Sequence, residues 1–268
     1  MKLALAQIEI ETAAVEANVQ RALAAIERAA TSGADCVALP EIFDIGYFAF
    51  ESYARHAQPL GGDTHERIRA AAIEHDIAVL AGTVVEDLEA SADAGESVPA
   101  TSGFANTAVL FDRDGERRLV YRKRHLFGYE SAEAELLVPG ETLSTVELCG
   151  HTLGVTTCYD LRFPELYREL IDLGVTMILV PSAWPYPRVE HWKLLPRARA
   201  VENLSYVGAV NGTGTVDDTG LVGRSAVYDP WGTPIAATDE ESTIVYADCP
   251  VDRVDTVRST FPALDNRR

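Results

Sequence analysis

GVTTCYDLRFPEL, residues 154–166 of this 268-residue chain, combines an apolar, strand-like run with the start of a helix. Leu153–Thr157 is typical of a buried strand, and Pro164 suits the first position of a helix. Cys158 therefore falls at a sharp turn from strand to helix, where a nucleophile is exposed and the N–H of Tyr159 would face a substrate oxygen. Taken alone, a cysteine after an apolar strand is more often an inert buried thiol.

Strand-like and helix-like segments alternate along the whole chain. Apolar runs predict buried strands at Leu3–Ile8, Cys36–Leu39, Ile77–Ala81, Thr107–Phe111, Thr152–Thr156, Met177–Val180 and Tyr206–Val210. Helical spacing of apolar residues predicts helices at Val15–Ala30, Thr64–His75, Pro164–Leu173 and Trp192–Glu202. This order favours α/β layers, while turn sequences at Asp112–Gly115 and Asp229–Gly232 indicate hairpins and hence antiparallel strands. We expect one mixed sheet or a pair of them.

The length and the 47% hydrophobic content suffice for one large core, so we expect a single domain over residues 1–268. Glu86–Gly103 lacks periodicity and is rich in acidic and small residues, which predicts an exposed, mobile loop insertion. The tail from about residue 251 contains VDRVDTVR, which favours a short helix. Gly212–Gly223 is glycine-rich but lacks the GK[ST] ending of a phosphate loop, so we interpret it as a flexible loop.

The formal charge of −18 arises from 41 acidic and 23 basic residues. Such a field repels nucleic acid and anionic membranes, so neither is an expected partner. The basic residues are almost all arginines and the acidic ones are dispersed, which resembles a halophile's surface; an ordinary acidic protein is the alternative. No run approaches the length of a membrane span, and the N-terminus turns acidic before a signal peptide could form, so we expect a cytoplasmic protein.

Cysteine and histidine spacing does not favour a disulfide framework or a metal site. The four cysteines form no CxxC pair, and a cytoplasmic setting would keep them reduced. The six histidines show neither HxxxH nor HExxH spacing, so a structural zinc site is disfavoured. A papain-like pair of Cys158 and His191 is also disfavoured, because EHW at the head of a helix does not indicate a catalytic base.

Two more candidate catalytic residues follow strand-like runs. Glu41 comes directly after CVALP, and an apolar setting there would raise its pKa towards the range of a general base. Lys123 lies in YRKRHLF, in a chain that otherwise relies on arginine, and a compact ammonium suits a developing oxyanion. The ordinary alternatives are a carboxylate at a helix start for Glu41 and a solvated turn residue for Lys123.

These segments together resemble the ordered signatures of the nitrilase superfamily of carbon–nitrogen hydrolases: PEIF around Glu41, YRKRHLF around Lys123 and CYDLRFPE around Cys158. The resemblance continues through PSAWPYPRVEHW, RARAVEN and DPWG, spans roughly Lys2–Asp248, and is strongest with the omega-amidase-like branch. It implies a four-layer αββα sandwich with two mixed β-sheets, a homodimer, and a Glu–Lys–Cys triad that needs no cofactor. On this chain the triad is Glu41, Lys123 and Cys158.

The superfamily also has a second glutamate between the HLF motif and a Pro-Gly pair, here residues 139–140. Glu130, Glu133 and Glu135 all precede this pair, and the spacing favours Glu133. The resemblance implies that this glutamate orients Lys123 and the substrate amide. At least two of the three glutamates are expected to be part of a solvated acidic turn.

The implied reaction releases ammonia and a carboxylate from a small amide through a thioester on Cys158, with an ω-amide of a 2-oxo acid as the first substrate to test. An N-carbamoyl compound or a nitrile is the alternative within enzymes. A catalytically inactive binding protein on the same fold is the alternative of another class.

Substrate-contacting residues are expected in loops that follow strands. Trp184 and Arg188 follow the strand at Met177–Val180, and Arg188 could bind a substrate carboxylate or equally form a surface salt bridge. Tyr47 could form a wall of the pocket, although ordinary core packing is the simpler interpretation. Asp160 and Arg162 are expected to pair behind the Cys158 turn and fix its geometry.

Overall fold

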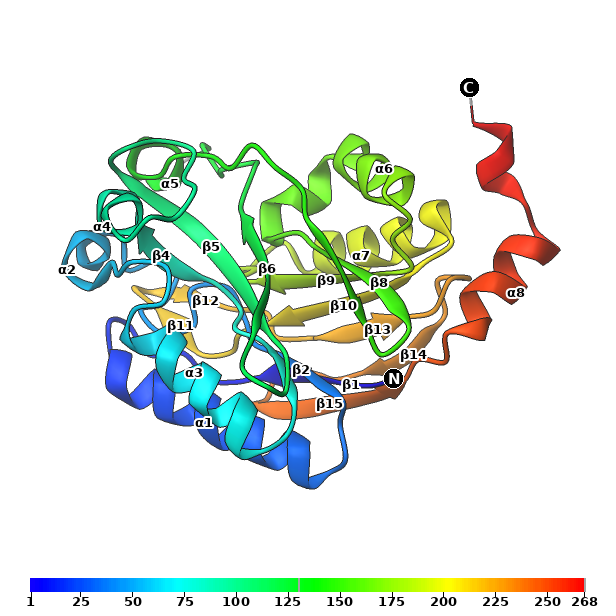
Figure 1. Ribbon diagram of the computed structural model, residues 1–268, viewed down its shortest axis with the longest axis horizontal. Helices are drawn as coiled ribbons and strands as arrows, with labels where there is room; N and C mark the ends of the chain where they lie inside the picture. The colour runs from blue at the N-terminus through cyan, green and yellow to red at the C-terminus, as the bar shows by residue number, and fades with distance from the viewer. Residues whose placement is uncertain (130, 268) are drawn as a thin grey trace.

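Two large β-sheets form the centre of the computed structural model, which describes residues 1–129 and 131–267 (Figure 1). The strands of the first sheet are β1 (Lys2–Gln7), β2 (Cys36–Ala38), β3 (Ala78–Leu80), β4 (Val84–Asp87), β5 (Phe104–Phe111), β6 (Arg117–Arg122) and β15 (Thr243–Asp248). Those of the second are β7 (Thr145–Leu148), β8 (His151–Val155), β9 (Met177–Ser182), β10 (Tyr206–Asn211), β13 (Ala226–Tyr228) and β14 (Pro234–Ala237).

Both sheets are mixed. The first has the order β15-β1-β2-β3-β5-β4, with β6 also paired to β5, and the second has the order β14-β13-β10-β9-β8-β7. In each sheet the middle strands are parallel, β1-β2-β3 and β8-β9-β10, and the outer pairings are antiparallel. Both predicted hairpins are present as β5-β6 and β13-β14.

Helices cover the outer face of each sheet, which confirms the predicted four-layer αββα sandwich (Figure 1). The helices are α1 (Val15–Thr31), α2 (Tyr53–His56), α3 (Asp63–Glu74), α4 (Leu88–Asp93), α5 (Glu133–Leu136), α6 (Pro164–Asp172), α7 (Val189–Asn203) and α8 (Asp252–Thr260). The long helices α1 and α3 pack on the first sheet, and α6 and α7 pack on the second.

The two sheets bury apolar side chains against each other. Leu5 of β1 and Leu110 of β5 share a fully buried cluster with Leu153 of β8 and Leu179 of β9. Each side chain of this size contributes on the order of 2 kcal/mol when it leaves water. This central layer fixes the relative position of the strand ends, and the candidate site lies beyond those ends.

Two loop predictions need correction. The segment Glu86–Gly103 is not an exposed loop throughout, because Glu86 is fully buried in β4 and residues 88–93 form α4, whose Leu88 and Ser91 are buried. Gly212–Gly223 contains a small hairpin of β11 (Thr215–Val216) and β12 (Thr219–Gly220). The expected helix in the C-terminal tail is present as α8.

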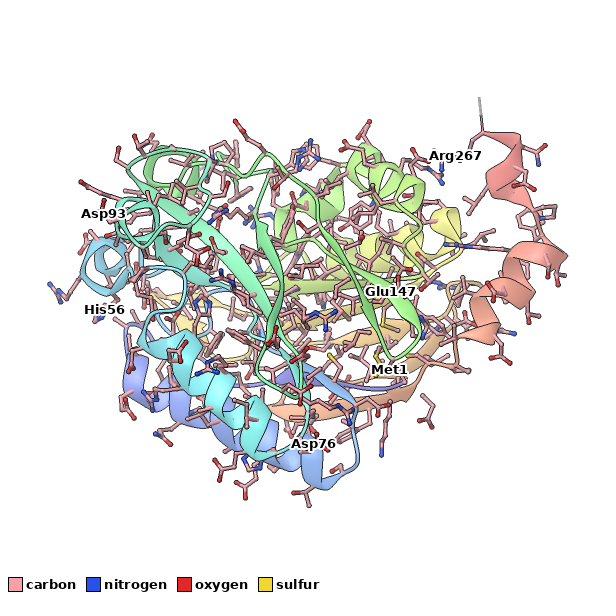
Figure 2. All side chains as sticks on the ribbon, viewed as in Figure 1. Met1, His56, Asp76, Asp93, Glu147 and Arg267 are labelled. Atoms are coloured by element: carbon pink, nitrogen blue, oxygen red, sulfur yellow. The ribbon has the colours of Figure 1, made fainter. Side chains whose placement is uncertain are left out.

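Acidic side chains project from widely separated parts of the surface. Figure 2 shows Asp76, Asp93 and Glu147, all exposed, pointing outward in different directions. Within residues 1–129 and 131–267, none of the helices combines the length and the hydropathy that a bilayer crossing demands.

Candidate active site

The three predicted triad residues lie just beyond strand ends of both sheets and converge. Glu41 follows β2, Lys123 follows β6 of the same sheet, and Cys158 follows β8 of the other sheet. Their exposed fractions are 0%, 1% and 8%, respectively. A buried charge is stable only when it is paired or hydrogen-bonded, so the contacts of these side chains explain why they are tolerated inside the protein.

The ammonium of Lys123 joins two buried carboxylates. Its Nζ lies 2.8 Å from Oε1 of Glu41, 2.8 Å from Oε1 of Glu133 and 3.0 Å from Oε2 of Glu133. The second Glu41 oxygen, Oε2, accepts a hydrogen bond of 2.9 Å from the N–H of Ala183. Two carboxylates and one ammonium leave this cluster with one net negative charge.

Glu133 is the glutamate that the structure places against Lys123. Besides the ammonium, its Oε2 accepts the Phe127 N–H at 2.7 Å and the Tyr47 hydroxyl at 2.9 Å. Glu135 is exposed on the same short helix, α5. Glu130, the remaining candidate, lies outside the described residues. The orienting role of Glu133 stays a prediction, and its geometry is suited to that role.

Sequence reasoning missed Asn106, a buried residue of β5. Its Nδ2 donates to Oε1 of Glu41 at 2.8 Å and to Oε1 of Glu133 at 3.1 Å. A single asparagine inside an apolar strand run carries no pattern that would single it out. Only the pairing of β5 with the elements around it shows its position.

Cys158 occupies a strained turn. Its φ of +45° lies in the left-handed region, which is unfavourable for a residue with a side chain, and the 3-10 turn Cys158–Arg162 follows directly. Arg199 of α7 stabilises this turn, since its Nε and one terminal nitrogen donate to the carbonyl of Leu161 at 3.0 and 2.7 Å. Backbone strain held by such contacts is typical of a functional position.

Asp160 and Arg162 do not pair with each other, which corrects the prediction. Oδ2 of Asp160 accepts the Tyr121 hydroxyl at 2.6 Å and the Thr157 N–H at 2.9 Å. Arg162 instead lies over the Trp184 ring, 5.1 Å from its centre. In a 3-10 turn, with three residues per turn, side chains two positions apart point in different directions. Asp160 ties the turn to β6 through Tyr121 instead.

Burial and charge decide the resting protonation states. Burial raises the pKa of the Cys158 thiol well above its ordinary value, and the charge of Glu41 adds to this, whereas Lys123 opposes it. Burial likewise raises the pKa of Glu41 against the opposing charge of Lys123. Burial alone would lower the pKa of Lys123, but Glu133 and Glu41 raise it well above its ordinary value. The thiol is therefore protonated at rest, the lysine is charged, and Glu41 is a stronger base than a free carboxylate.

Two glycines allow close approach behind two of these residues. A Cβ on Gly82 would lie 2.0 Å from the carbonyl oxygen of Pro40, directly before Glu41. A Cβ on Gly140 would lie 2.1 Å from the carbonyl oxygen of Arg122, directly before Lys123. Any larger residue at position 82 or 140 would therefore displace the backbone that precedes Glu41 or Lys123.

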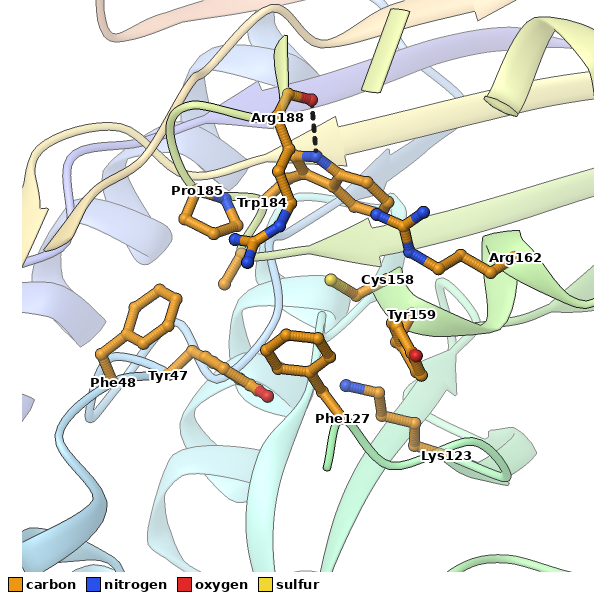
Figure 3. Close-up of a pocket in the computed structure, with 11 residues that line it drawn as sticks. Tyr47, Phe48, Lys123, Phe127, Cys158, Tyr159, Arg162, Trp184, Pro185 and Arg188 are labelled. Atoms are coloured by element: carbon orange, nitrogen blue, oxygen red, sulfur yellow. Dashed lines mark hydrogen bonds between the residues drawn. The ribbon is translucent and has the colours of Figure 1, made fainter. Parts of the chain in front are cut away.

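A pocket opens above Cys158 (Figure 3). Tyr47 and Trp184, both predicted to contact substrate, line it together with Phe48, Phe127 and Tyr159. Figure 3 shows the thiol of Cys158 and the ammonium of Lys123 facing the space that these rings enclose.

Two guanidinium groups also line the pocket, from Arg188, which was predicted, and from Arg162, which was not. Among the described residues neither has a carboxylate partner: Arg188 lies over Phe127, and Arg162 over Trp184 and Tyr159. Within the same residues no cluster of His, Cys, Asp and Glu is suited to hold a metal ion.

An αββα sandwich with a buried cysteine beside a glutamate–lysine cluster in an aromatic pocket is the fold and site of a thiol hydrolase. The chain matches the family "Carbon-nitrogen hydrolase" over residues 2–259 and belongs to that family. It is 36% identical over 244 residues to 2-oxoglutaramate amidase of Paenarthrobacter nicotinovorans, covering 88% of this chain and 79% of the relative. It is 32% identical over 276 residues to omega-amidase NIT2 of Homo sapiens, covering 100% and 95%.

Solved structures show the same likeness. Saccharomyces cerevisiae Nit3, a member of branch 10 of the nitrilase superfamily, superposes with a TM-score of 0.88 at 30% identity, covering 100% of this chain and 96% of that one. A mutant amidase from Nesterenkonia sp. AN1 has a TM-score of 0.82 at 27% identity, covering 98% of each chain, and shows the Michael addition of acrylamide at its active site cysteine. The predicted superfamily, fold and amidase class are thereby confirmed.

Proposed function

We propose that this protein hydrolyses the ω-amide of a small 2-oxo acid, with Cys158 as nucleophile, Glu41 as general base and Lys123 as oxyanion donor. The observation that carries the proposal is the Lys123 ammonium, held 2.8 Å from Glu41 in the pocket that Cys158 lines. A nucleophile, a base and a cation with complementary protonation states are the minimum that acyl transfer requires.

Acylation begins with transfer of the Cys158 proton to Glu41 as the sulfur attacks the amide carbonyl. This transfer moves a proton within the cluster, so its net charge is unchanged and no new charge has to be created in the apolar pocket. The Sγ–C bond forms, and the carbonyl oxygen takes the negative charge, which Lys123 and the N–H of Tyr159 stabilise. Glu41 returns the proton to the nitrogen, the C–N bond breaks, and ammonia leaves.

Deacylation repeats these steps with water. Glu41 takes a proton from water, the oxygen attacks the thioester, and the C–S bond breaks as the proton passes to sulfur. The products are a carboxylic acid and the free thiol. Only side chains and backbone of this chain take part, so the proposed reaction needs no cofactor.

The carboxylate end of the substrate is assigned to Arg188 and Arg162. These guanidinium groups lack carboxylate partners among the described residues, in a chain with 41 acidic residues. Guanidinium groups that line a pocket without a carboxylate partner favour an anionic ligand, and a 2-oxo acid amide has its carboxylate at the end opposite to the amide. The names of two relatives, 2-oxoglutaramate amidase and omega-amidase, support this substrate class.

The experiment compares ammonia release from a 2-oxo acid ω-amide with that from a neutral amide of similar length. Cys158→Ala should abolish release from both, whereas Arg188→Met should lower kcat/KM about 10- to 100-fold for the anionic substrate alone. Cys149→Ala is the matched control, because Cys149 is an exposed free thiol in the turn that precedes β8, at the end of that strand opposite to Cys158. Turnover that survives in Cys158→Ala would refute the mechanism, and equal losses on both amides in Arg188→Met would refute the carboxylate assignment. Activity only on N-carbamoyl compounds or nitriles would refute the substrate class.

We also propose that the whole chain is one domain that pairs as a homodimer through the α7 face of the sandwich. Leu194 and Val201, seven residues apart and therefore on one face of α7, are 62% and 48% exposed. Trp231 and Phe261, with ring centres 5.9 Å apart, are 42% and 53% exposed, and Gly232 next to Trp231 lies against Val201 of that face. Light scattering on the intact chain and on Leu194→Glu tests this pairing, and a monomeric parent protein would exclude it.

Two environmental proposals rest on charge and thiols. We propose that the dispersed acidic surface is suited to a high-salt environment. The unfolding temperature should then continue to rise with potassium chloride concentration after ordinary screening of the surface charges is complete. We propose a cytoplasmic location, which the four free cysteines support because a reducing compartment would keep them unpaired.

A further inference from the structure

Asn106 lies at the junction of the two carboxylates in the cluster. Both hydrogens of its Nδ2 are committed, one to Oε1 of Glu41 at 2.8 Å and one to Oε1 of Glu133 at 3.1 Å. These are the same oxygens that accept from Lys123. Its backbone carbonyl also accepts the Lys123 N–H at 2.9 Å. One residue therefore contacts three members of the cluster.

The side-chain amide has properties that other donors lack here. It offers two N–H groups from one nitrogen and carries no charge, so it bridges two carboxylates without adding a second cation. A second cation would neutralise the cluster and weaken Glu41 as a base, and a hydroxyl would supply only one donor. The amide carbonyl, Oδ1, is buried without a hydrogen-bond partner in the described structure. A buried unpaired acceptor is costly, which favours a functional reason for retaining the asparagine.

Opposing effects act on the ionisation of the Glu41 carboxyl group. Burial and the negative charge of Glu133 favour the protonated acid, whereas Lys123 favours the carboxylate. The ionisable groups that face this cluster from the surrounding elements are Lys123, Glu133, Cys158, Tyr47 and Tyr53. A Glu41 that is already protonated cannot accept the thiol proton, so donors to its ionised form are required.

We propose that Asn106 is a positioning residue that bridges Glu41 and Glu133 and keeps Glu41 in the ionised form that accepts the Cys158 proton. This inference rests on the proposed role of Glu41. It goes beyond the triad and the second glutamate, because it gives a function to an uncharged strand residue that does not itself line the pocket.

The test measures the pH dependence of Cys158 alkylation by iodoacetamide together with that of kcat/KM for ammonia release. In Asn106→Ala the acidic limb of both profiles should move up by about one pH unit, with activity partly recovered at high pH. Asn106→Asp should move it further, because a third carboxyl joins the cluster. A residue that only supports the fold would lower the rate at every pH without moving the limb.

Thr107→Val is the matched control. Thr107 is the next residue of β5, equally buried, and its Oγ1 donates to another buried carboxylate, that of Glu86, at 2.7 Å. Its removal should leave the acidic limb within about 0.2 pH units of the parent, since Glu86 pairs with Arg122 outside the catalytic cluster. Circular dichroism confirms folding of each variant, and Asn106→Ser is the milder substitution if alanine does not fold.

An unmoved limb in a folded Asn106→Ala or Asn106→Ser would overturn the inference. So would failure of all Asn106 variants to fold while Thr107→Val folds, because Asn106 would then be needed for the fold itself. The alkylation profile needs no amide substrate, so it tests Asn106 even if the proposed substrate is wrong. Loss of the acidic limb from the parent profile would instead count against Glu41 as the base.

Discussion

Replacing Glu133 by glutamine tests whether the second carboxylate positions Lys123. Oε1 of Glu133 accepts from Lys123 and Asn106, and Oε2 accepts from Lys123, Phe127 and Tyr47. A glutamine has one oxygen, so its NH₂ group must face donors on one side whichever way it is turned. At least two buried N–H donors then lose their acceptor, at about 1–3 kcal/mol each. We expect the free energy of unfolding to fall by about 2–6 kcal/mol at neutral pH.

The same substitution should lower kcat about 100-fold, since Lys123 would then face one carboxylate and one amide oxygen in place of two carboxylates, and a displacement of about 1 Å at a reacting group has this effect. Chemical denaturation measures the stability and ammonia release measures the rate. Glu135→Gln is the control, because Glu135 is exposed on the same helix and its change should stay within about 0.5 kcal/mol. Glu133→Gln with near-parental stability and less than a threefold loss in rate would refute the assigned role.

Two further substitutions probe the loop after β2 and the glycine behind Lys123. Burial raises the pKa of Asp44 to about 7, from about 4 in an unfolded chain, so its ionisation destabilises the fold progressively between pH 4 and 7. Asp44→Asn should add about 2–4 kcal/mol to the free energy of unfolding at pH 8 and little at pH 4, whereas the exposed Asp63→Asn should show no such pH-dependent gain. Gly140→Ala forces a Cβ against the Arg122 carbonyl and should lower kcat at least about tenfold, but Gly128→Ala, with no atom nearer than 3.5 Å, should not; equal rates in the two variants would argue against this contact.

The sequence predicts those elements whose burial follows a local period. Each predicted strand and helix is present with small shifts in its ends, because apolar runs and helical faces report directly on the central layers. The hairpin turn at Asp229–Gly232 implied a strand at Pro234–Ala237, but the bounds of this strand could not be predicted, since most of it is exposed at a sheet edge and carries no apolar run. Helix α4 escaped because its sequence is acidic and weakly apolar, and burial of Leu88 and Ser91 against the rest of the fold determines it.

The candidate site likewise contains some residues that the sequence predicts and others that it does not. Glu41, Lys123 and Cys158 follow strands within recognisable motifs, so their convergence could be predicted from the order of the chain. Asn106 and Arg162 could not, because their roles depend on contacts between segments that are remote in sequence. For Arg162 the local pattern was misleading. Asp160 and Arg162 have opposite charges and are two residues apart, which suggests an ion pair, but in a 3-10 turn their side chains point in different directions.

Lysine at position 123 is informative because the chain uses so few lysines. Lys2 and Lys193, the other two, make exposed contacts with the carbonyl of Ser32 and with Glu190. At Lys123 the ammonium bonds Glu41 and Glu133 from different directions, and a planar guanidinium would instead favour a bidentate pair with one carboxylate. The arrangement of these two carboxylates therefore explains why position 123 has a lysine and not an arginine. The compositional bias is thus broken at a buried position where a compact, rotatable charge contacts two carboxylates, and where the proposed mechanism requires a donor to a developing oxyanion.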